Sequence, residues 1–401
     1  MYLENGIISE RQAFRIGLLE NITIGIVVVP YITTRVAGTE HIWAFGLGMI
    51  LTCLYGLLVY GFSKWFPEGL AEAINNNLGW PARLIDFVYA MRYVLRSAVI
   101  LLFFATVIHA YMLRSMNMWL IAVPFSFICG YGALRDIERR GRLLEMLFWW
   151  MLVPLILVAV FAISNVEWRS LPEELWGGAD LSGTGSFGRI LQGAYLVFLV
   201  LSGMELMIFT LPRQKQNNWK NGLKMLVWIV IAITLAYTFI IGILGVGWTR
   251  SDSTAALNVM EASAFPGGLV ERLDYPVLAF WVIGVFAVIS GYLFYAREFA
   301  CLLISHHEPD LQKRRKKNSH DTERMGEQSL IVLALIAVLL LAMWGWSSDV
   351  VSRWMAWYMV WIDVGDSYSS TDASCFKNWS PAIRPWAVLM AFMLSTPRSI
   401  R

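Results

Sequence analysis

The stretch "LVLSGMELMIFTLP", Leu199–Pro212, places one acidic residue in an otherwise apolar run. Glu205 stands just after Ser202 and Gly203, and Pro212 closes the run. An ionised carboxylate inside a membrane span costs about 2.5–3.5 kcal/mol, so such residues mark functional sites or paired groups. Ser202, Gly203 and Glu205 are therefore candidate site residues, and the rest of the chain indicates which kind of site they form.

The composition is that of a membrane protein. Of the 401 residues, 57% are apolar and 15% are charged, which is too little polar surface for a soluble chain of this length. Apolar runs such as Met225–Trp248 and Ser329–Trp346 reach the roughly 20 residues that a helix needs to cross a bilayer. We predict an all-α, multi-pass integral membrane protein.

Ten transmembrane helices account for the apolar pattern. Lys and Arg gather in alternate connections, including the "KRRKK" run at 313–317, so the positive-inside rule places both termini in the cytoplasm with an even number of spans. The predicted spans are 12–31, 41–62, 84–113, 118–134, 143–164, 190–211, 223–248, 273–304, 330–346 and 350–364.

The spans divide into two halves of five, at 12–164 and 190–363, and the second half enters the membrane from the opposite side. Transporters built from 5+5 inverted repeats have this arrangement, with a ligand site near the midplane on the broken first helix of each half. We predict one permease-like domain over 1–363, with breaks in the first and sixth helices and an atypical C-terminal tail at 364–401.

Polar residues beside glycine occur at corresponding places in both helices. The first span contains "GLLENITIGIVVVP", Gly17–Pro30, with polar residues next to a glycine near its middle. Amides freed by the two breaks, and the N-termini of the half-helices, are expected to hold a ligand carboxylate. The alternative is that the glycines permit close helix packing while the polar groups bond to neighbouring helices. The predicted ligand-binding residues are Asn21, Thr23, Gly25, Ser202, Gly203 and Glu205.

The negative charge of Glu205 must be compensated by protonation, by a cationic partner or by a watery cavity. Residues that could do so are candidates for a supporting role. Arg92 and Arg96 stand four residues apart, on one face of the span 84–113. A structural Glu205–arginine pair and a ligand or proton role both remain open, with the pair slightly favoured. Glu20 is a second candidate for coupling. Ser290 either faces the first span and holds a coupling cation or is a small residue at a helix crossing.

The sequence contains no glycine-rich phosphate loop, His-x-x-x-His pair or nucleophile motif, and the four cysteines are scattered. We therefore expect no enzymatic activity, no cofactor, no metal site and no nucleic-acid partner.

Four stretches resemble a known family: "IISERQAFRIGLLENITIGIVVVP" (7–30), "RDIERRGRLLEM" (135–146), "FLVLSGMELMIFTLP" (198–212) and the run 256–296 that contains "ERLD". Together they are similar to the endospore germination permeases, the GerAB-type B subunits of nutrient germinant receptors. These belong to the amino acid–polyamine–organocation superfamily, whose fold is LeuT-like. The similarity covers roughly residues 7–360.

The resemblance implies a spore germination protein of the inner membrane that binds a small nutrient, such as an amino acid, between the first, third, sixth and eighth helices. It also implies A-type and C-type receptor subunits as partners. A proton- or cation-coupled amino acid transporter of the same superfamily is the alternative function. The sequence departs from the family after Asp366, where the apolar character of the last helix is interrupted.

Overall fold

A computed structural model describes residues 7–65, 80–177, 186–214, 219–252, 254–262, 274–305 and 321–345. All of them lie in one compact unit, Met1–Tyr358. Within these ranges the chain is helical, apart from a single β-bridge between Ile8 and Gln214. The predicted all-α fold is confirmed.

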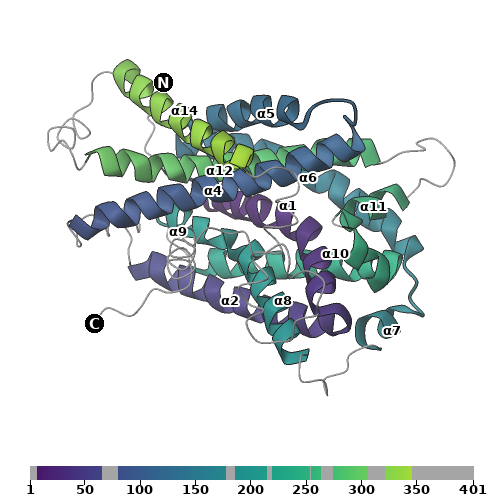
Figure 1. Ribbon diagram of the computed structural model, residues 1–401. Helices are drawn as coiled ribbons and strands as arrows, with labels where there is room; N and C mark the ends of the chain where they lie inside the picture. The colour runs from purple at the N-terminus through teal and green to yellow at the C-terminus, as the bar shows by residue number, and fades with distance from the viewer. Residues whose placement is uncertain are drawn as a thin grey trace, which may run out of the picture. The chain divides into compact units, whose positions relative to one another are not determined.

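The helices are connected by short segments (Figure 1). The 3-10 segments are η1 (Gly38–Glu40), η2 (Ile163–Asn165) and η3 (Ser202–Leu206). The α-helices are α1 (Glu10–Ala37), α2 (His41–Trp65), α4 (Trp80–Tyr111), α5 (Met118–Ala133), α6 (Ile137–Ala162), α7 (Leu171–Trp176), α8 (Ser186–Leu201), α9 (Met207–Thr210), α10 (Trp219–Ser251), α11 (Ala255–Ala262), α12 (Asp274–Ser305) and α14 (Asp321–Gly345).

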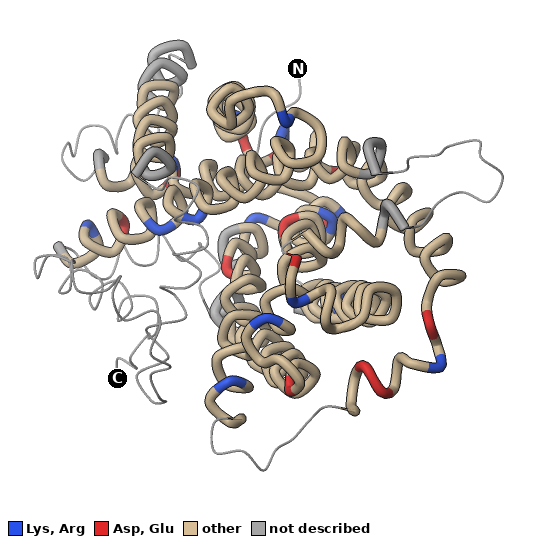
Figure 2. The backbone as a smooth tube through the Cα atoms, turned by 45° about the vertical axis from the view of Figure 1, so that its right-hand side comes forward, with Lys and Arg blue, Asp and Glu red and all other residues tan. Residues whose placement is uncertain are grey.

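The first nine predicted spans correspond to these helices, with α8, η3 and α9 together forming the sixth. The tenth span, 350–364, and the tail, 364–401, lie outside the described residues. By length and composition, six described stretches can cross a membrane, and one of them contains both α1 and α2. Shorter apolar helices occur at Met118–Ala133 and Gln328–Leu341. Figure 2 accordingly shows long helical segments with few charged positions.

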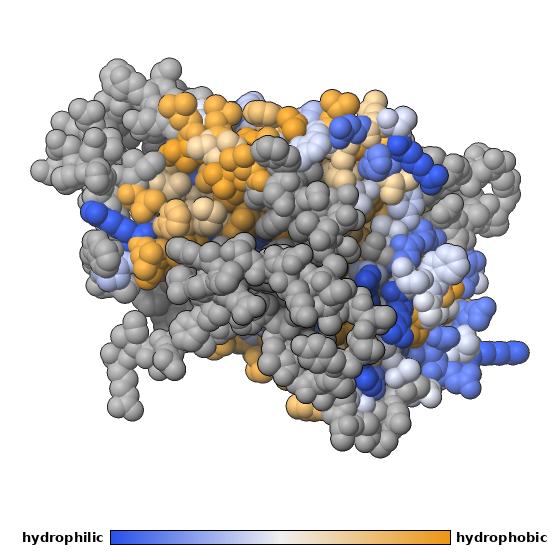
Figure 3. All heavy atoms as spheres, in the orientation of Figure 1, coloured by the Kyte–Doolittle hydropathy of each residue, from blue (hydrophilic) through white to orange (hydrophobic). Residues whose placement is uncertain are grey.

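Large apolar side chains remain exposed on the outer helices. In Figure 3 they gather over the part of the surface where Figure 1 places α4, α12 and α14. Leu84 on α4 and Leu330 on α14 are 56% and 69% exposed. A continuous apolar surface of this kind is costly in water and is covered by lipid tails in a bilayer.

Helix α1 is the centre of the packing. Figure 1 shows it between α4, α6 and α12 on one side and α2, α8 and α10 on the other. It contacts α2, α6, α8, α10 and α12, and 20 of its 28 residues are buried. A helix that is apolar on every face is stable only where other helices surround it.

The break predicted at Gly25 in the first span is not present, because α1 is one continuous helix from Glu10 to Ala37. Its polar side chains form hydrogen bonds to backbone carbonyls of the same helix. Asn21 Nδ2 donates to the Gly17 carbonyl at 2.9 Å, and Thr23 Oγ1 donates to the Leu19 carbonyl at 2.6 Å. Such bonds to the carbonyl four residues earlier satisfy the side chain without opening the backbone.

The break predicted in the sixth span takes the form of a change from α-helix to 3-10 helix, without unwinding of the backbone. Helix α8 ends at Leu201, the backbone continues as the 3-10 segment η3, and one further turn of α-helix forms α9. A 3-10 segment of this length inside a helix changes which amides bond to which carbonyls, and such segments often occur at hinges. Gly203 and Glu205 both lie within η3 and are buried.

The connection between α6 and α8 contains a helix, α7, that the sequence did not predict. Its Glu174 carboxylate accepts a hydrogen bond from the Val246 amide at 2.8 Å, next to Gly245, where α10 is interrupted by a positive φ of 72°. The Glu174 carbonyl lies 3.1 Å from His41 Nε2 at the start of α2. These contacts fix α7 against α2 and α10.

Close packing of α2 on α8 depends on Gly48. A Cβ atom at this position would lie 2.6 Å from Val197 Cβ and 2.8 Å from the Ala194 carbonyl oxygen. We expect Gly48→Ala to destabilise the protein by about 1–3 kcal/mol, because α8 must shift to relieve the overlap. Thermal unfolding of the purified protein in detergent measures this loss.

Gly46 provides the matched control on the same helix, because a Cβ built there meets nothing within 4 Å. Gly46→Ala is expected to leave stability unchanged or raise it by up to about 1 kcal/mol, since alanine favours the helix. Equal melting temperatures for the two variants would contradict the close approach of α2 and α8.

Candidate functional site

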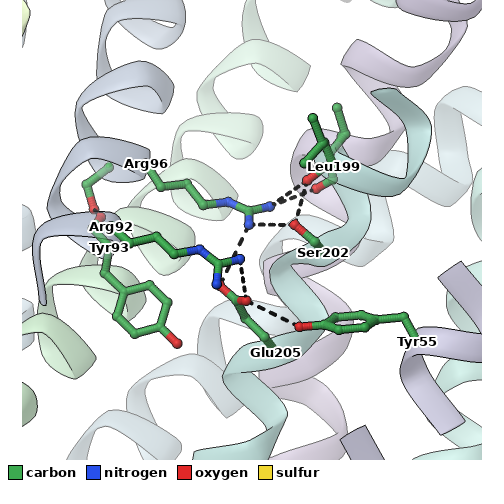
Figure 4. Close-up of polar contacts among 9 residues, drawn as sticks. Tyr55, Arg92, Tyr93, Arg96, Leu199, Ser202 and Glu205 are labelled. Atoms are coloured by element: carbon green, nitrogen blue, oxygen red, sulfur yellow. Dashed lines mark hydrogen bonds and ion pairs between the residues drawn. The ribbon is translucent and has the colours of Figure 1, made fainter. Parts of the chain in front are cut away.

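The break after α8 is closed by an arginine from α4 (Figure 4). Arg96 donates from Nη2 to the carbonyls of Leu199 and Val200 at 3.0 and 3.1 Å, and from Nη1 to Ser202 Oγ at 2.7 Å. Carbonyls at a helix C-terminus lack partners within the helix and carry a partial negative charge. A guanidinium, with five donors in a planar fork, satisfies several of them at once.

Glu205 lies one turn further along η3 and is also held by α4. Its Oε2 atom lies 2.6 Å from Arg92 Nη2 and accepts a hydrogen bond from the Tyr55 hydroxyl at 3.3 Å. Its Oε1 atom lies 3.8 Å from Arg96 Nη1. The carboxylate side chain is 3% exposed, against 23% for Arg92 and 20% for Arg96. The geometry contains the Glu205–arginine pair that was the slightly favoured alternative, with Arg92 the nearer partner and Arg96 at the edge of contact.

The cluster has an excess of positive charge, with two guanidinium groups facing one carboxylate. The partial charge of the α8 carbonyls offsets part of this excess. Arg96 also stacks over the ring of Tyr292 on α12, with Cζ 5.1 Å from the ring centroid, and cations are attracted to such ring faces. Through Arg96, the 3-10 segment is tied to both α4 and α12.

Several polar groups converge on Gly203. A Cβ atom at this position would lie 3.0 Å from the Tyr292 hydroxyl, 3.3 Å from Asn21 Oδ1 and 3.9 Å from Arg96 Nη2. Asn21 Oδ1 is buried and has no hydrogen-bond partner among the described residues. An unpaired amide oxygen in a buried position costs about 1–3 kcal/mol, so a ligand donor placed there gains that stabilisation. Gly203, with no side chain of its own, lets these groups approach its backbone closely.

A second buried ion pair lies on α1. Glu20 Oε1 lies 2.6 Å from Arg140 Nη2 of α6, and the two side chains are 1% and 4% exposed. Arg140 also donates to the Ala287 carbonyl of α12 at 3.0 Å. A Cβ on Gly291 would lie only 2.6 Å from both the carboxylate and the guanidinium, so the pair fits against α12 because this residue is glycine.

Three of the predicted site residues, Thr23, Gly25 and Ser290, pack against other helices and lie away from the groups around Gly203. Thr23 faces Gly284 and Met151, because a Cβ on Gly284 would overlap its hydroxyl and its Oγ1 lies 3.5 Å from Met151 Sδ. Gly25 is packed against Ile233 and Leu201, with its amide inside the continuous helix. The expectation that amides near Gly25 bind a ligand carboxylate is therefore wrong.

Ser290 does not face α1. Its hydroxyl donates to the Ala287 carbonyl of its own helix at 3.2 Å, and its Cβ lies 3.2 Å from a Cβ built on Gly132 of α5. The geometry is that of a small residue at the crossing of α12 and α5, which was one of the two interpretations of the sequence.

Sequence reasoning missed Arg140, Tyr292 and Tyr55. Arg140 was assigned to a connection because of its charged neighbours, yet α6 begins at Ile137. A signal was available, because Ile137, Arg140, Leu144 and Phe148 recur at helical spacing and all four are buried. Nothing in the pattern distinguishes Tyr55 or Tyr292 from other tyrosines in apolar helices.

A small apolar cavity lies beside this region, between α1, α6 and α12. It is lined by residues that include Ile22, Ile26, Met151 and Trp281, and its volume of about 20 Å³ is enough for one water molecule. A cavity of this size and lining does not accommodate an amino acid. Among the described residues, no group of three or more His, Cys, Asp or Glu side chains is placed to bind a metal ion.

Two solved transporter structures share the fold. One is a Na⁺-coupled sialic acid symporter in a substrate-bound, outward-open state, with a TM-score of 0.55, 13% identity, and coverage of 86% of this chain and 75% of the symporter. The other is MhsT in complex with L-phenylalanine, with a TM-score of 0.55, 11% identity, and coverage of 83% and 78%. The predicted LeuT-like fold is thus confirmed.

Two curated relatives match at 22% identity. The spore germination protein YndE of Bacillus subtilis (strain 168) aligns over 294 residues, which cover 72% of this chain and 78% of YndE. The spore germination protein GerQB of Bacillus cereus aligns over 299 residues, which cover 71% and 76%. The family model described as "spore germination protein" matches residues 7–305. This chain is a multi-pass integral membrane protein that belongs to the spore germination protein family.

Proposed function

We propose that this protein is the membrane subunit of a nutrient germinant receptor and binds an amino acid or similar small nutrient at Gly203. The observation that carries the proposal is the convergence of Asn21 Oδ1, the Tyr292 hydroxyl and Arg96 on that glycine, at the break between α8 and α9. Breaks of this kind free backbone groups, and they form the ligand sites of transporters with inverted repeats.

The chemistry of an amino acid matches these groups. Its ammonium can donate to the unpaired Asn21 Oδ1, and its carboxylate can accept from the Tyr292 hydroxyl. The Arg96 guanidinium, whose Nη2 atom donates to the Leu199 and Val200 carbonyls, attracts that carboxylate by its charge. The excess positive charge of the Arg92, Arg96 and Glu205 cluster favours a ligand that brings a carboxylate. One structural neighbour was solved with L-phenylalanine, which has both groups.

Thr23, Gly25 and Ser290 take no direct part in this binding mode, because they face other helices. Ser202 and Glu205 act by holding η3 in place through Arg96 and Arg92. Ligand contact is thereby assigned to side chains of α1, α4 and α12 rather than to amides of a broken α1.

The receptor role implies A-type and C-type subunits as partners, with the lipid bilayer as the surroundings. The receptor role implies a location in the inner membrane, and the distribution of Lys and Arg supports an orientation with both termini in the cytoplasm. The matched structures are transporters, in keeping with a protein that is not an enzyme.

A proton- or cation-coupled amino acid transporter is the second candidate. It is favoured by the transporter fold and by the two buried carboxylates, Glu20 and Glu205. The two candidates differ in whether the ligand crosses the membrane. Uptake of radiolabelled amino acids into proteoliposomes, together with the presence of genes for A-type and C-type subunits beside this gene, separates them.

Ligand binding at Gly203 is tested with a panel of amino acids in a thermal-shift assay, on the purified protein alone and with its partner subunits. We expect at least one amino acid to raise the melting temperature, because a ligand that binds only the folded state stabilises it. Gly203→Ala is expected to weaken the binding of that ligand by about tenfold or more, since the added methyl group would lie where the Asn21, Tyr292 and Arg96 side chains converge.

Gly61→Ala is the control for this experiment, because its methyl group meets nothing within 4 Å. It should bind as the wild type does. If no amino acid stabilises any form of the protein, the proposed function fails; if Gly203→Ala binds as tightly as Gly61→Ala, the ligand lies elsewhere.

The structural role of Glu205 is tested by Glu205→Gln. Removing the carboxylate leaves Arg92 and Arg96 without their counter-charge, and we expect a loss of about 2 kcal/mol, reduced from the range for fully buried pairs because both arginines are about a fifth exposed. Glu145→Gln removes the more exposed partner of Arg15 and is expected to cost under about 1 kcal/mol. Unfolding in detergent measures both, and equal losses would contradict a buried lock at Glu205.

A further inference from the structure

The interruption of α10 at Gly245 is bridged by a segment from elsewhere in the chain. In a continuous α-helix, the amide of Val246 donates to the carbonyl four residues earlier, which is that of Gly242. Here the Gly242 carbonyl accepts instead from the Glu167 amide at 2.9 Å. The Val246 amide donates to Glu174 Oε2 at 2.8 Å. Both new partners belong to the connection between α6 and α8 that contains α7, so two bonds to this connection replace one bond within α10.

Gly245 is compatible with two forms of α10. Its φ of 72° and ψ of 164° lie in a region of backbone space that is essentially restricted to glycine. Glycine also adopts helical dihedral angles, so the same residue fits a continuous helix. In that form, the Val246 amide would bond to the Gly242 carbonyl, and Glu167 and Glu174 would lose these partners. The docked connection and a continuous α10 therefore compete for the same two backbone groups.

We propose that the α6–α8 connection is a reversible latch that holds α10 in its broken form, and that release of this latch lets α10 close into a continuous helix. The exchange costs α10 no hydrogen bond, because its amide and its carbonyl have a partner in either form. Glu167 is exposed and Glu174 is partly exposed, on a connection that lies at the edge of the described helices (Figure 1). Water can therefore replace the partners that these two residues lose, and the two forms differ little in hydrogen bonding, as a switch requires.

The connection is attached by a small number of buried side chains. Within the described residues 163–177, Val166 and Leu171 are buried, at 6% and 9% exposed. Both pack on Gly242, where a Cβ atom would lie 2.9 Å from Val166 Cγ1 and 3.1 Å from Leu171 Cδ1. His41 Nε2 lies 3.1 Å from the Glu174 carbonyl and adds one more contact. A segment with so little buried apolar surface can open locally at a cost well below that of global unfolding.

The segment of α10 after the break, residues 246–251, is joined to α11 by a polar cluster. The Asp252 carboxylate accepts hydrogen bonds from the amide and hydroxyl of Thr254 and from the Asn258 side chain. The hydroxyl of Tyr111, at the end of α4, contacts Thr254 Oγ1 at 2.8 Å and Asn258 Oδ1 at 2.6 Å. Helix α11 in turn packs against α1 and α12. A change in the direction of residues 246–251 therefore acts on α11 and, through it, on α1, α4 and α12.

Hydrogen–deuterium exchange of the purified protein in detergent tests the proposal, because it follows the connection and α10 separately. Glu174→Ala removes the acceptor of the Val246 amide, and Gly245→Ala disfavours the backbone angles of the broken form. In both variants we expect the amides of residues 163–177 to exchange about tenfold faster or more, because the latch is released. The amides of residues 243–249 are expected to exchange no faster than in the wild type, because they bond within the continuous helix.

Three variants act as controls. Gly247→Ala adds a methyl group two residues beyond the break, where a Cβ atom meets nothing within 4 Å, and should exchange as the wild type does. Glu173→Ala removes an exposed carboxylate from α7 and should also match the wild type. Glu174→Gln keeps a side-chain oxygen that can accept from the Val246 amide, so its exchange should lie closer to the wild type than that of Glu174→Ala.

Faster exchange in the connection without faster exchange in α10 supports the proposal. Faster exchange of both segments shows that the contacts stabilise a single form, and it overturns the proposal. Unchanged exchange in the connection also overturns it, as does an effect of Gly247→Ala equal to that of Gly245→Ala. Should one of Glu174→Ala and Gly245→Ala fail to fold, the other decides; if both fail, docking is a requirement for folding rather than a reversible step, and the proposal fails. No nutrient is present in these measurements, so their outcome is independent of the proposed function.

Discussion

The hydrogen bonds from Arg96 to the Leu199 and Val200 carbonyls allow a helix to stop and restart among apolar neighbours. In lipid or in a dry helical core, no water replaces the partners that backbone carbonyls lose when an α-helix tightens into a 3-10 segment. The side chain that supplies the donors therefore determines where the break lies. Because Arg96 comes from α4 and stacks on Tyr292 of α12, the position of η3 also fixes the relation among α4, α8 and α12.

The two buried carboxylates are compensated in different ways, and the difference assigns them different roles. Glu205 faces two arginines that are each about a fifth exposed, in a cluster with positive charge to spare. Glu20 faces one arginine that is almost fully buried and is shared with α12. The first arrangement can accept an anionic group, whereas the second is balanced in charge and serves to join helices.

Apolar periodicity was sufficient to find the helices, because lipid-spanning segments must be long and apolar throughout. The predicted span 118–134 is observed as Met118–Ala133, and the span 84–113 as Trp80–Tyr111. The pairing of Glu205 with Arg92 was also accessible, since a carboxylate in a span requires a partner and two arginines stood four residues apart. The rotation of each helix about its own axis could not be predicted from the sequence. A helix that is apolar on every face gives no indication of which face packs against which neighbour. The rotation of α12 about its axis directs Ser290 toward α5, and the rotation of α6 directs Arg140 toward α1.

The contrast between α1 and the sixth span shows why a glycine beside polar residues does not by itself predict a break. Both segments have that composition, yet only the second changes from α-helix to 3-10 helix. In α1, Asn21 and Thr23 return their hydrogen bonds to carbonyls of the same helix, while Ser202 donates to the Leu199 carbonyl and also accepts from Arg96. A break requires donors from outside the helix to replace lost partners, and at η3 it is Arg96 that provides them. Since α1 stays closed, it offers only side-chain atoms to the proposed site, of which Asn21 Oδ1 is unpaired among the described residues. Under the proposed binding mode, specificity would follow from which ligands can donate to this amide oxygen while placing a negative charge near the Arg96 guanidinium of α4.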